Sequence, residues 1–151
     1  ENPNMTGMGT TLSLAWFLDD TVYIAHIGDS RVYQLRKGEL RQITWDHSVV
    51  GELVRSGALD EEEALRHPHR NVLTRSLGTS PIAEFDLHEI SLRDTEGLLL
   101  CTDGLYSLVS HQELAATIRE MEDPQLAVEQ LVALANERGG HDNITALLVL
   151  P

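Results

Sequence analysis

The stretch Val22–Leu35, VYIAHIGDSRVYQL, contains two runs with the composition of strands. Valine, isoleucine and tyrosine are frequent in both runs, as they are in β-strands generally. Between them lies Gly28-Asp29-Ser30-Arg31, whose glycine, aspartate and serine favour a tight turn. The stretch therefore predicts two strands joined by a turn, and it leaves open whether Asp29 only closes that turn or also has a chemical role.

The segments on either side extend this pattern. A run rich in threonine and large apolar residues covers Thr10–Leu18, and Asp19-Asp20 separates it from the strand at Thr21–Ile27. After the central turn, a Lys37-Gly38 turn leads into LRQIT at residues 40–44. Short strands joined by tight turns predict a β-meander, which is typical of an antiparallel sheet.

A helical insertion is predicted between Asp46 and Gly78. Its first part, SVVGELVRSGAL, has apolar residues at helical spacing. Asp60 followed by Glu63 is a capping-box pattern that predicts a short helix through Arg66.

The last part of the chain is predicted to contain two strands, two helices and a final strand. Glu84–Leu92 reads as a strand, and GLLLCTDG (97–104) reads as a strand buried on both faces. One helix is predicted from Ser110 to about Met121, and a second follows Asp123-Pro124 with an apolar stripe that includes Leu131. A final strand is NITALLVL. The order lacks strict βαβ alternation, which favours an antiparallel sheet system with helices packed outside it.

The composition excludes several classes of function. The chain has 151 residues, which suits one domain, and 42% of them are hydrophobic, enough for a core. Its net charge of -13 disfavours nucleic acids and anionic membranes as partners. Cys101 is the single cysteine, which fits a reducing cytosol and a cytoplasmic location. No apolar run is long enough to span a bilayer, and the first residues do not resemble a signal peptide.

Three aspartates occupy similar positions next to predicted strands. Asp29 follows one strand, Asp103 ends the most apolar strand, and Asp142 precedes the last strand. Carboxylates held by glycine turns at strand ends can converge at one rim of a sheet, where they repel each other unless a cation neutralises them. Such oxygen donors suit Mg²⁺ or Mn²⁺. Each motif alone is also an ordinary turn, so a purely structural role stays open.

Other candidate sites are weaker. GMGTTL (7–12) lacks the third glycine of a dinucleotide-binding turn and the lysine of a P-loop. His67 and His69 have no nearby cysteine ligands for zinc, and Ser30 lies near His26 without a Gly-x-Ser-x-Gly elbow. Three arginines could clamp a phosphate or form ordinary salt bridges: Arg31, Arg70 and Arg75.

Taken in order, the motifs GMGTTL, AHIGDSRVY, LTRSLG, LLLCTDGL and GGHDNIT resemble the protein phosphatase 2C family of metal-dependent serine/threonine phosphatases, most of all its bacterial single-domain members. The resemblance runs from Gly7 to Leu150 and implies an α+β fold, an antiparallel β-sandwich flanked by helices. It also identifies the insertion at about 46–78 as the family's flap, which we expect to be mobile and to help select substrates.

The resemblance implies a metal site and a reaction. In the family, two Mn²⁺ or Mg²⁺ ions bind phosphate and activate a water that attacks phosphorus. Asp103 resembles the ligand in the family's Asp-Gly motif, Asp142 the ligand in its Asp-Asn turn, and Asp29 a ligand of a third metal. The expected function is dephosphorylation of phosphoserine and phosphothreonine proteins, the substrates of a serine/threonine kinase.

The sequence also departs from the family's pattern. The family begins with a phosphate-binding arginine, an acidic ligand and an Asp-Gly motif that bridges both metals, and none of these precedes Gly7. We therefore expect residues 1–151 to be the C-terminal two-thirds of one such domain, incomplete at the N-terminus and without the bridging aspartate or the general acid. The isolated chain is expected to be inactive and to dimerise or to recruit its missing half. The alternative is a non-catalytic phosphatase-like interaction module.

Overall fold

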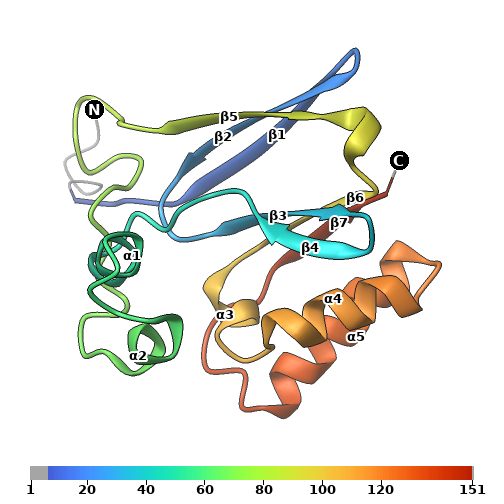
Figure 1. Ribbon diagram of the computed structural model, residues 1–151. Coiled ribbons are helices and arrows are strands. Elements are labelled where there is room, and N and C mark those ends of the chain that lie inside the picture. Colours follow the sequence, from blue (N-terminus) through green and yellow to red (C-terminus); the bar gives the residue numbers. More distant parts are fainter. Residues whose placement is uncertain (1–6, 151) are drawn as a thin grey trace.

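The computed structural model describes residues 7–150 and consists of two stacked antiparallel sheets with helices beneath one of them (Figure 1). One sheet has the strand order β1-β2-β5 and the other β4-β3-β6-β7. The strands are β1 (Leu12–Leu18), β2 (Thr21–Ile27), β3 (Arg31–Arg36), β4 (Glu39–Gln42), β5 (Asp86–Ser91), β6 (Gly97–Cys101) and β7 (Ala146–Val149). The helices are α1 (Val49–Arg55), α2 (Glu61–Arg66), α3 (Asp103–Tyr106), α4 (His111–Glu120) and α5 (Pro124–Glu137), and a short 3₁₀ helix covers Leu92–Asp94. The predicted antiparallel β-sandwich with helices outside it is confirmed.

The connection between β2 and β3 differs from the predicted meander. β2 pairs with β1 and β5, whereas β3 pairs with β4 and β6, so the two strands lie in different sheets. The expected continuous meander through Gly28–Arg31 is therefore wrong, and the turn carries the chain from one sheet to the other. The physical reason is that Val22 and Ile24 of β2 are buried against Val32 of β3, across the sandwich rather than along one sheet.

Two apolar layers hold the sandwich and its helices together. Between the sheets, the buried residues are Val22, Ile24, Val32 and Leu98. Between the four-stranded sheet and the helices, a larger core contains Tyr33, Leu35, Leu40, Leu99, Cys101, Leu105, Val109, Leu114, Ile118, Leu131 and Ala135. Successive residues of β6 alternate between the two layers, which confirms that this strand is buried on both faces.

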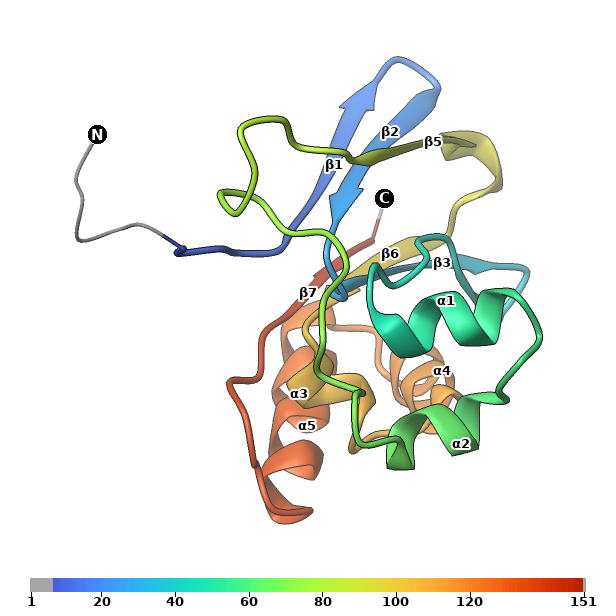
Figure 2. The ribbon, with the colours of Figure 1, turned by 90° about the vertical axis from the view of Figure 1, so that its left-hand side faces the viewer.

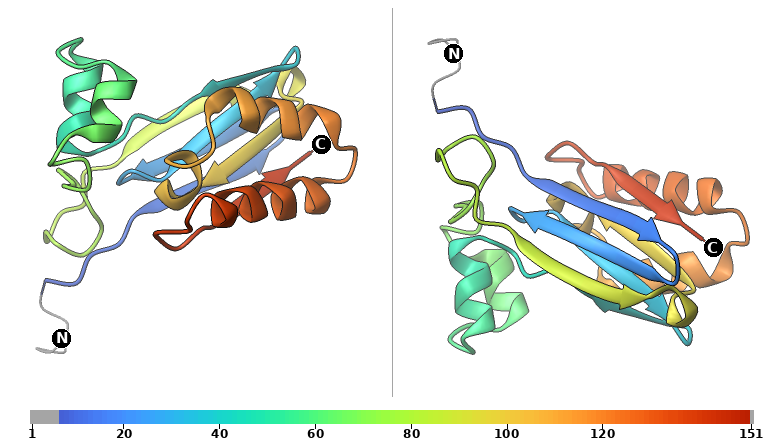
Figure 3. Two further views of the ribbon diagram at one scale, coloured as in Figure 1. Left: turned by 90° about the horizontal axis from the view of Figure 1, so that it is seen from below. Right: turned by 90° about the horizontal axis from the view of Figure 1, so that it is seen from above.

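The predicted caps of α4, α5 and α2 are present. The Ser110 hydroxyl accepts from the Glu113 backbone N–H while the Glu113 carboxylate accepts from Ser110, and Asp60 and Glu63 form the same capping box at α2. Asp123 caps α5, whose first residue is Pro124. Figure 3 (left) shows α4 and α5 side by side across the four-stranded sheet.

Two strands are shorter than predicted, because a side-chain hydroxyl takes the place of a backbone carbonyl in the hydrogen bonding between strands. β4 ends at Gln42 rather than Thr44, because the Val32 N–H donates to the Thr44 side chain (3.0 Å). β7 begins at Ala146 rather than Asn143, because the Thr145 N–H donates to the Thr102 hydroxyl (3.0 Å).

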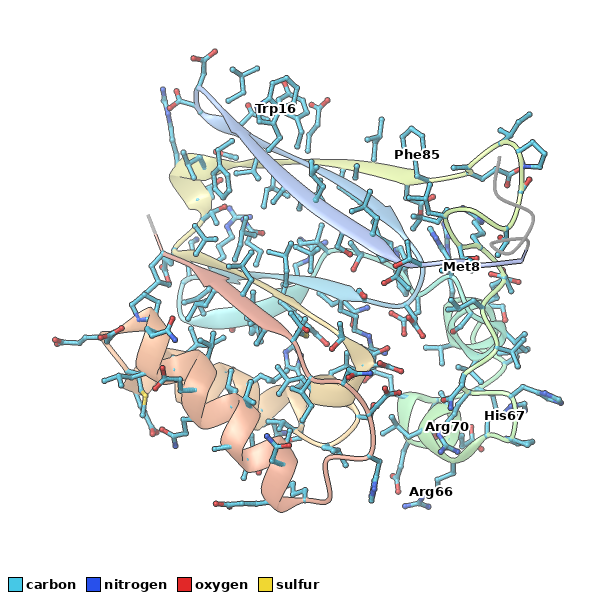
Figure 4. All side chains as sticks on the ribbon, turned by 180° about the vertical axis from the view of Figure 1, so that it is seen from behind. Met8, Trp16, Arg66, His67, Arg70 and Phe85 are labelled. Atoms are coloured by element: carbon cyan, nitrogen blue, oxygen red, sulfur yellow. The ribbon has the colours of Figure 1, made fainter. Side chains whose placement is uncertain are left out.

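The outer face of the β1-β2-β5 sheet is bare in the part of the chain that the structure describes (Figure 3, right). Its exposed apolar side chains include Leu12, Leu14, Trp16, Leu18 and Leu87, with Trp16 at 59% exposure. Figure 4 shows Trp16 and Phe85 on the side of this sheet that faces away from the second sheet. A contiguous apolar surface of this kind is unusual for a free domain surface.

The insertion after β4 contains α1 and α2 at one end of the sandwich, beside the connection between β2 and β3 (Figure 2). Its base is fixed by the isolated bridge between Ser48 and Leu73, and its end by the bridge between Thr10 and Leu77. We call residues 46–78 the flap and residues 72–77 its return segment.

Within residues 7–150, no helix combines the length and hydrophobicity required to cross a membrane.

Candidate metal centre

The turn that carries Asp29 is tightly enclosed. Gly28 has φ +108°, and a Cβ atom there would lie 2.3 Å from Thr11 Cγ2. The Thr11 and Ser30 hydroxyls are 2.9 Å apart, and the Tyr106 hydroxyl donates to the Asp29 carbonyl (2.8 Å). The position of the Asp29 backbone is therefore set by contacts from several elements and not only by its own turn.

Arg31 is engaged in structural contacts rather than free to clamp a phosphate. Its Nε and Nη2 atoms donate to both carboxylate oxygens of Asp46, with the shortest distance at 2.7 Å. Its guanidinium lies 3.7 Å from the centre of the Tyr106 ring. Arg31 thus forms the salt bridge that the sequence allowed as the alternative to a phosphate clamp.

Asp103 and Asp142 are brought together by their neighbours. The Thr102 N–H donates to the Thr145 carbonyl (3.1 Å), and the Thr102 hydroxyl donates to the Asn143 carbonyl (3.1 Å). A Cβ atom on Gly104 would lie 2.4 Å from the Asn143 carbonyl oxygen, so only glycine permits this approach. The start of α3 and the loop before β7 are thus packed against each other.

Four aspartates at this end of the sandwich affect one another's charge: Asp29, Asp46, Asp103 and Asp142. Burial, followed by the charges of Asp103 and Asp46, raises the pKa of Asp29 to about 6. Burial also raises the pKa of Asp103, with an additional contribution from Asp142. Asp46 was not predicted from the sequence, because its contact with Arg31 is a tertiary contact that no local motif indicates.

The donor set fits a hard divalent cation but is not a complete site. Partly buried carboxylates that raise each other's pKa are stabilised by a nearby cation, and oxygen ligands suit Mg²⁺ or Mn²⁺. Among residues 7–150, however, no group of three or more acidic, histidine or cysteine side chains is arranged closely enough to hold a metal by itself. Asp29, Asp103 and Asp142 therefore remain predicted ligands.

The weaker candidates have structural explanations. Ser30 contacts Thr11, whereas His26 contacts Ser13 and two backbone carbonyls, so these two residues do not form a nucleophile and base. Arg75 forms an ion pair with Asp86 (3.1 Å). Burial raises the pKa of the Cys101 thiol to about 12, which makes it an unreactive core residue. The rings of the partly buried His67 and the exposed His69 are 5.6 Å apart, and no further ligand is grouped with them in the described chain.

The raised pKa of Asp29 predicts a pH dependence of stability. Its folded-state pKa of about 6 lies above its ordinary value near 4, so the charged carboxylate disfavours folding, and stability falls as pH rises from about 4 to about 6. Asp29→Asn is expected to remove this part of the pH dependence, measured as the difference in urea midpoint between pH 4 and pH 6.5. Asp19→Asn, at an exposed aspartate outside the site, serves as the control. An Asp29→Asn profile parallel to that of the parent would contradict the prediction.

The architecture, two stacked antiparallel sheets with helices packed against one of them, is that of an α+β sandwich, and the sequence comparison identifies the family. The family profile described as protein phosphatase 2C matches residues 1–137. The chain belongs to the protein phosphatase 2C family.

Individual relatives and solved structures agree with this assignment. The serine/threonine phosphatase stp of Listeria welshimeri is 41% identical over 146 residues, which cover 97% of this chain and 58% of the relative. Protein phosphatase PhpP of Streptococcus pneumoniae is 42% identical over 145 residues, covering 95% and 58%. The crystal structure of Stp1 from Staphylococcus aureus has a TM-score of 0.93 and 36% identity, covering 99% of this chain and 59% of that one. The catalytic domain of PstP in complex with two manganese ions has a TM-score of 0.86 and 36% identity, covering 97% and 60%. The chain thus spans less than two thirds of the length of these relatives.

Proposed function

We propose that this chain is part of a metal-dependent protein phosphatase that acts on phosphoserine and phosphothreonine in proteins. The observation that carries the proposal is that the charge of Asp103 raises the pKa of Asp29 while the charge of Asp142 raises the pKa of Asp103, in addition to burial. Membership of the protein phosphatase 2C family and relatives named serine/threonine phosphatases support it. The single buried cysteine supports a cytoplasmic location.

In this proposal, the three aspartates are ligands of Mn²⁺ or Mg²⁺. Bound metal would supply charge neutralisation at the phosphoryl oxygens and lower the pKa of the attacking water. The protein residues around them have holding roles. Tyr106 fixes the backbone of Asp29, and Thr102 joins the Asp103 helix to the loop that carries Asp142. The partial burial of Asp29 strengthens its attraction for a cation.

We further propose that these residues form one part of a larger phosphatase domain, with the flap at about 46–78. The remaining ligands would come from the portion of the domain that relatives carry outside the matched region. The incomplete ligand set among residues 7–150 supports this arrangement. The same observation favours a second candidate function, a phosphatase-like module that binds a protein partner without catalysis.

Hydrolysis of a phosphothreonine peptide in Mn²⁺ tests the proposal. The chain alone is expected to show no turnover above background. Turnover is expected when it is mixed with, or fused to, the complementary portion of a relative. In that complete form, Asp103→Asn is expected to lower the rate by more than about 100-fold, because losing even a residue that only supports a metal ligand typically costs 10–100-fold. Chelation of the metal is expected to abolish the activity.

The control for this assay is Asp19→Asn, a matched charge removal at an exposed turn. Turnover by the chain alone that disappears in Asp103→Asn would contradict the need for a complementary portion. A completed chain that remains inactive while it still binds phosphoprotein would favour the non-catalytic module.

A further inference from the structure

His47 occupies the point at which the flap leaves the sandwich, and its four polar groups contact three different segments. Its side chain is 4% exposed. The His47 backbone N–H donates to the Gly28 carbonyl (2.8 Å), and its carbonyl accepts from the Thr74 N–H (2.9 Å). The Nδ1 atom accepts from the Gly28 N–H (3.2 Å), and the Nε2 atom lies 3.3 Å from Asp86 Oδ2. One buried residue therefore joins the Asp29 turn, the return segment of the flap and strand β5.

The partners of the His47 ring determine where its proton lies. Because Nδ1 faces the Gly28 N–H, it must be an acceptor, and a neutral imidazole then carries its proton on Nε2, facing Asp86. The contact with Asp86 does not reach good hydrogen-bond geometry, and Nε2 has no other partner within residues 7–150. The carboxylate of Asp86 therefore faces the Nε2–H of the tautomer that accepts from Gly28, and its charge favours that tautomer.

The flap contacts both ends of this arrangement. Thr74 donates to the His47 carbonyl, and the next residue, Arg75, donates to Asp86 Oδ1 (3.1 Å). Burial alone would raise the pKa of Asp86, but His47 and the charge of Arg75 outweigh it and lower this pKa. A displacement of the return segment therefore acts on His47 through its backbone and, by way of Asp86, through its ring.

His26 does not provide the same link. Its ring lies 5.0 Å from that of His47 and contacts the carbonyls of Gly28 (3.0 Å) and Trp45 (3.1 Å) and the hydroxyl of Ser13. These partners lie in the sheet, the turn and the residues before the flap. His26 supports the turn from the side of the sandwich, whereas the contacts of His47 extend to the return segment.

We propose that His47 is a positioning residue that couples the return segment of the flap to the turn carrying Asp29. A substrate that moves the flap would in this way alter the placement of the Asp29 carboxylate. The role of Asp29 as a metal ligand rests on the proposed function. The coupling itself is a property of the chain that can be measured without metal or substrate.

The tautomer of His47 gives the first test. We expect ¹⁵N NMR of the chain to show the Nε2–H form of His47. In Asp86→Asn the amide oxygen is expected to keep the hydrogen bond from Arg75, so that the NH₂ group faces Nε2 and donates to it. The ring proton then lies on Nδ1, which can no longer accept from the Gly28 N–H. The Gly28 amide is then expected to exchange with solvent about tenfold faster, the effect of losing one hydrogen bond. An unchanged tautomer and unchanged exchange would overturn the proposal.

Variants of His47 itself give the second test. His47→Ala removes the acceptor and is expected to accelerate Gly28 exchange about tenfold. His47→Asn places an amide oxygen near the former Nδ1 position and is expected to restore protection to within about threefold of the parent. His69→Asn, at an exposed histidine of the flap, is the matched control and is expected to leave Gly28 unchanged. The Leu99 amide in β6 reports whether a variant is still folded, and if His47→Ala is not, the Asp86→Asn measurement decides alone.

Coupling to the flap is tested with Arg75→Gln. This change is expected to accelerate Gly28 exchange in the parent but to have no further effect in the His47→Ala background, because the link is already broken. Equal acceleration in both backgrounds would show that the flap does not act through His47, and would overturn the proposal. The chain completed with the complementary portion of a relative separates this inference from the proposed function. If the flap and Gly28 are coupled through His47 but the completed chain has no phosphatase activity, this inference stands and the proposed function is refuted.

Discussion

Gly28→Ala is expected to destabilise the protein by about 2–6 kcal/mol, the sum of backbone strain and overpacking. The residue has φ +108°, where an L side chain is strained. Its new Cβ would also lie 2.3 Å from Thr11 Cγ2 and 2.5 Å from Thr11 Cβ, so the chain before β1 must shift. The free energy of unfolding measured in urea checks the prediction.

Gly57→Ala is the matched control for Gly28→Ala. Gly57 also has positive φ (+76°), but no described heavy atom lies within 4 Å of the position that its Cβ would occupy. It is therefore expected to incur only the strain, about 1–3 kcal/mol. Equal losses at the two glycines would show that the contact with Thr11 relaxes easily and that the turn is less tightly enclosed than the structure indicates.

Leu131→Ala is expected to cost about 2–5 kcal/mol, the range for large-to-small substitutions in a core. Leu131 is 0% exposed and belongs to the apolar layer between the four-stranded sheet and the helices. The sequence predicted a buried position from the apolar stripe of α5, and the structure confirms the burial. The urea midpoint is expected to fall without a change in the slope of the transition.

Leu126→Ala separates the effect of burial from the effect of helix propensity. Leu126 lies on the same helix but is 54% exposed. Its replacement by alanine is expected to change stability by less than about 0.5 kcal/mol, as is usual for surface positions. A similar loss at both leucines would mean that the exposed face of α5 is covered by another part of the protein or by a partner.

Local signals account for the parts of the fold that were predicted from the sequence. The capping boxes at Ser110 and Asp60 involve residues three positions apart, so the motif and the contact coincide. The pairing of strands is different, because it depends on residues that are distant in sequence. The run before Gly28 and the run after it have the same composition whether they pair with each other or cross between sheets, and only the packing of Val22 and Ile24 against Leu98 decides between the two.

The residues of the candidate site also fall into two groups, those indicated by local motifs and those that depend on tertiary contacts. Asp29, Asp103 and Asp142 could be predicted because each lies in a short motif of the family. Asp46 could not, since it joins the group through its ion pair with Arg31, which depends on the placement of the segment after β4. The part played by His47 was likewise not visible in the sequence, because all four of its contacts are made with residues that lie far away along the chain.

The crossing between the sheets leaves little freedom for changes in chain length. β2 ends at Ile27 and β3 begins at Arg31, so three residues cross between layers that are about 10 Å apart in stacked sheets, which is close to their extended reach. One inserted residue would exchange the faces of β3, moving Val32 out of the layer between the sheets and Tyr33 out of the layer beneath the helices. The turn at Lys37-Gly38 only joins neighbouring strands at an edge and can lengthen without this effect. We therefore expect insertions and deletions to be tolerated around this crossing but not within it.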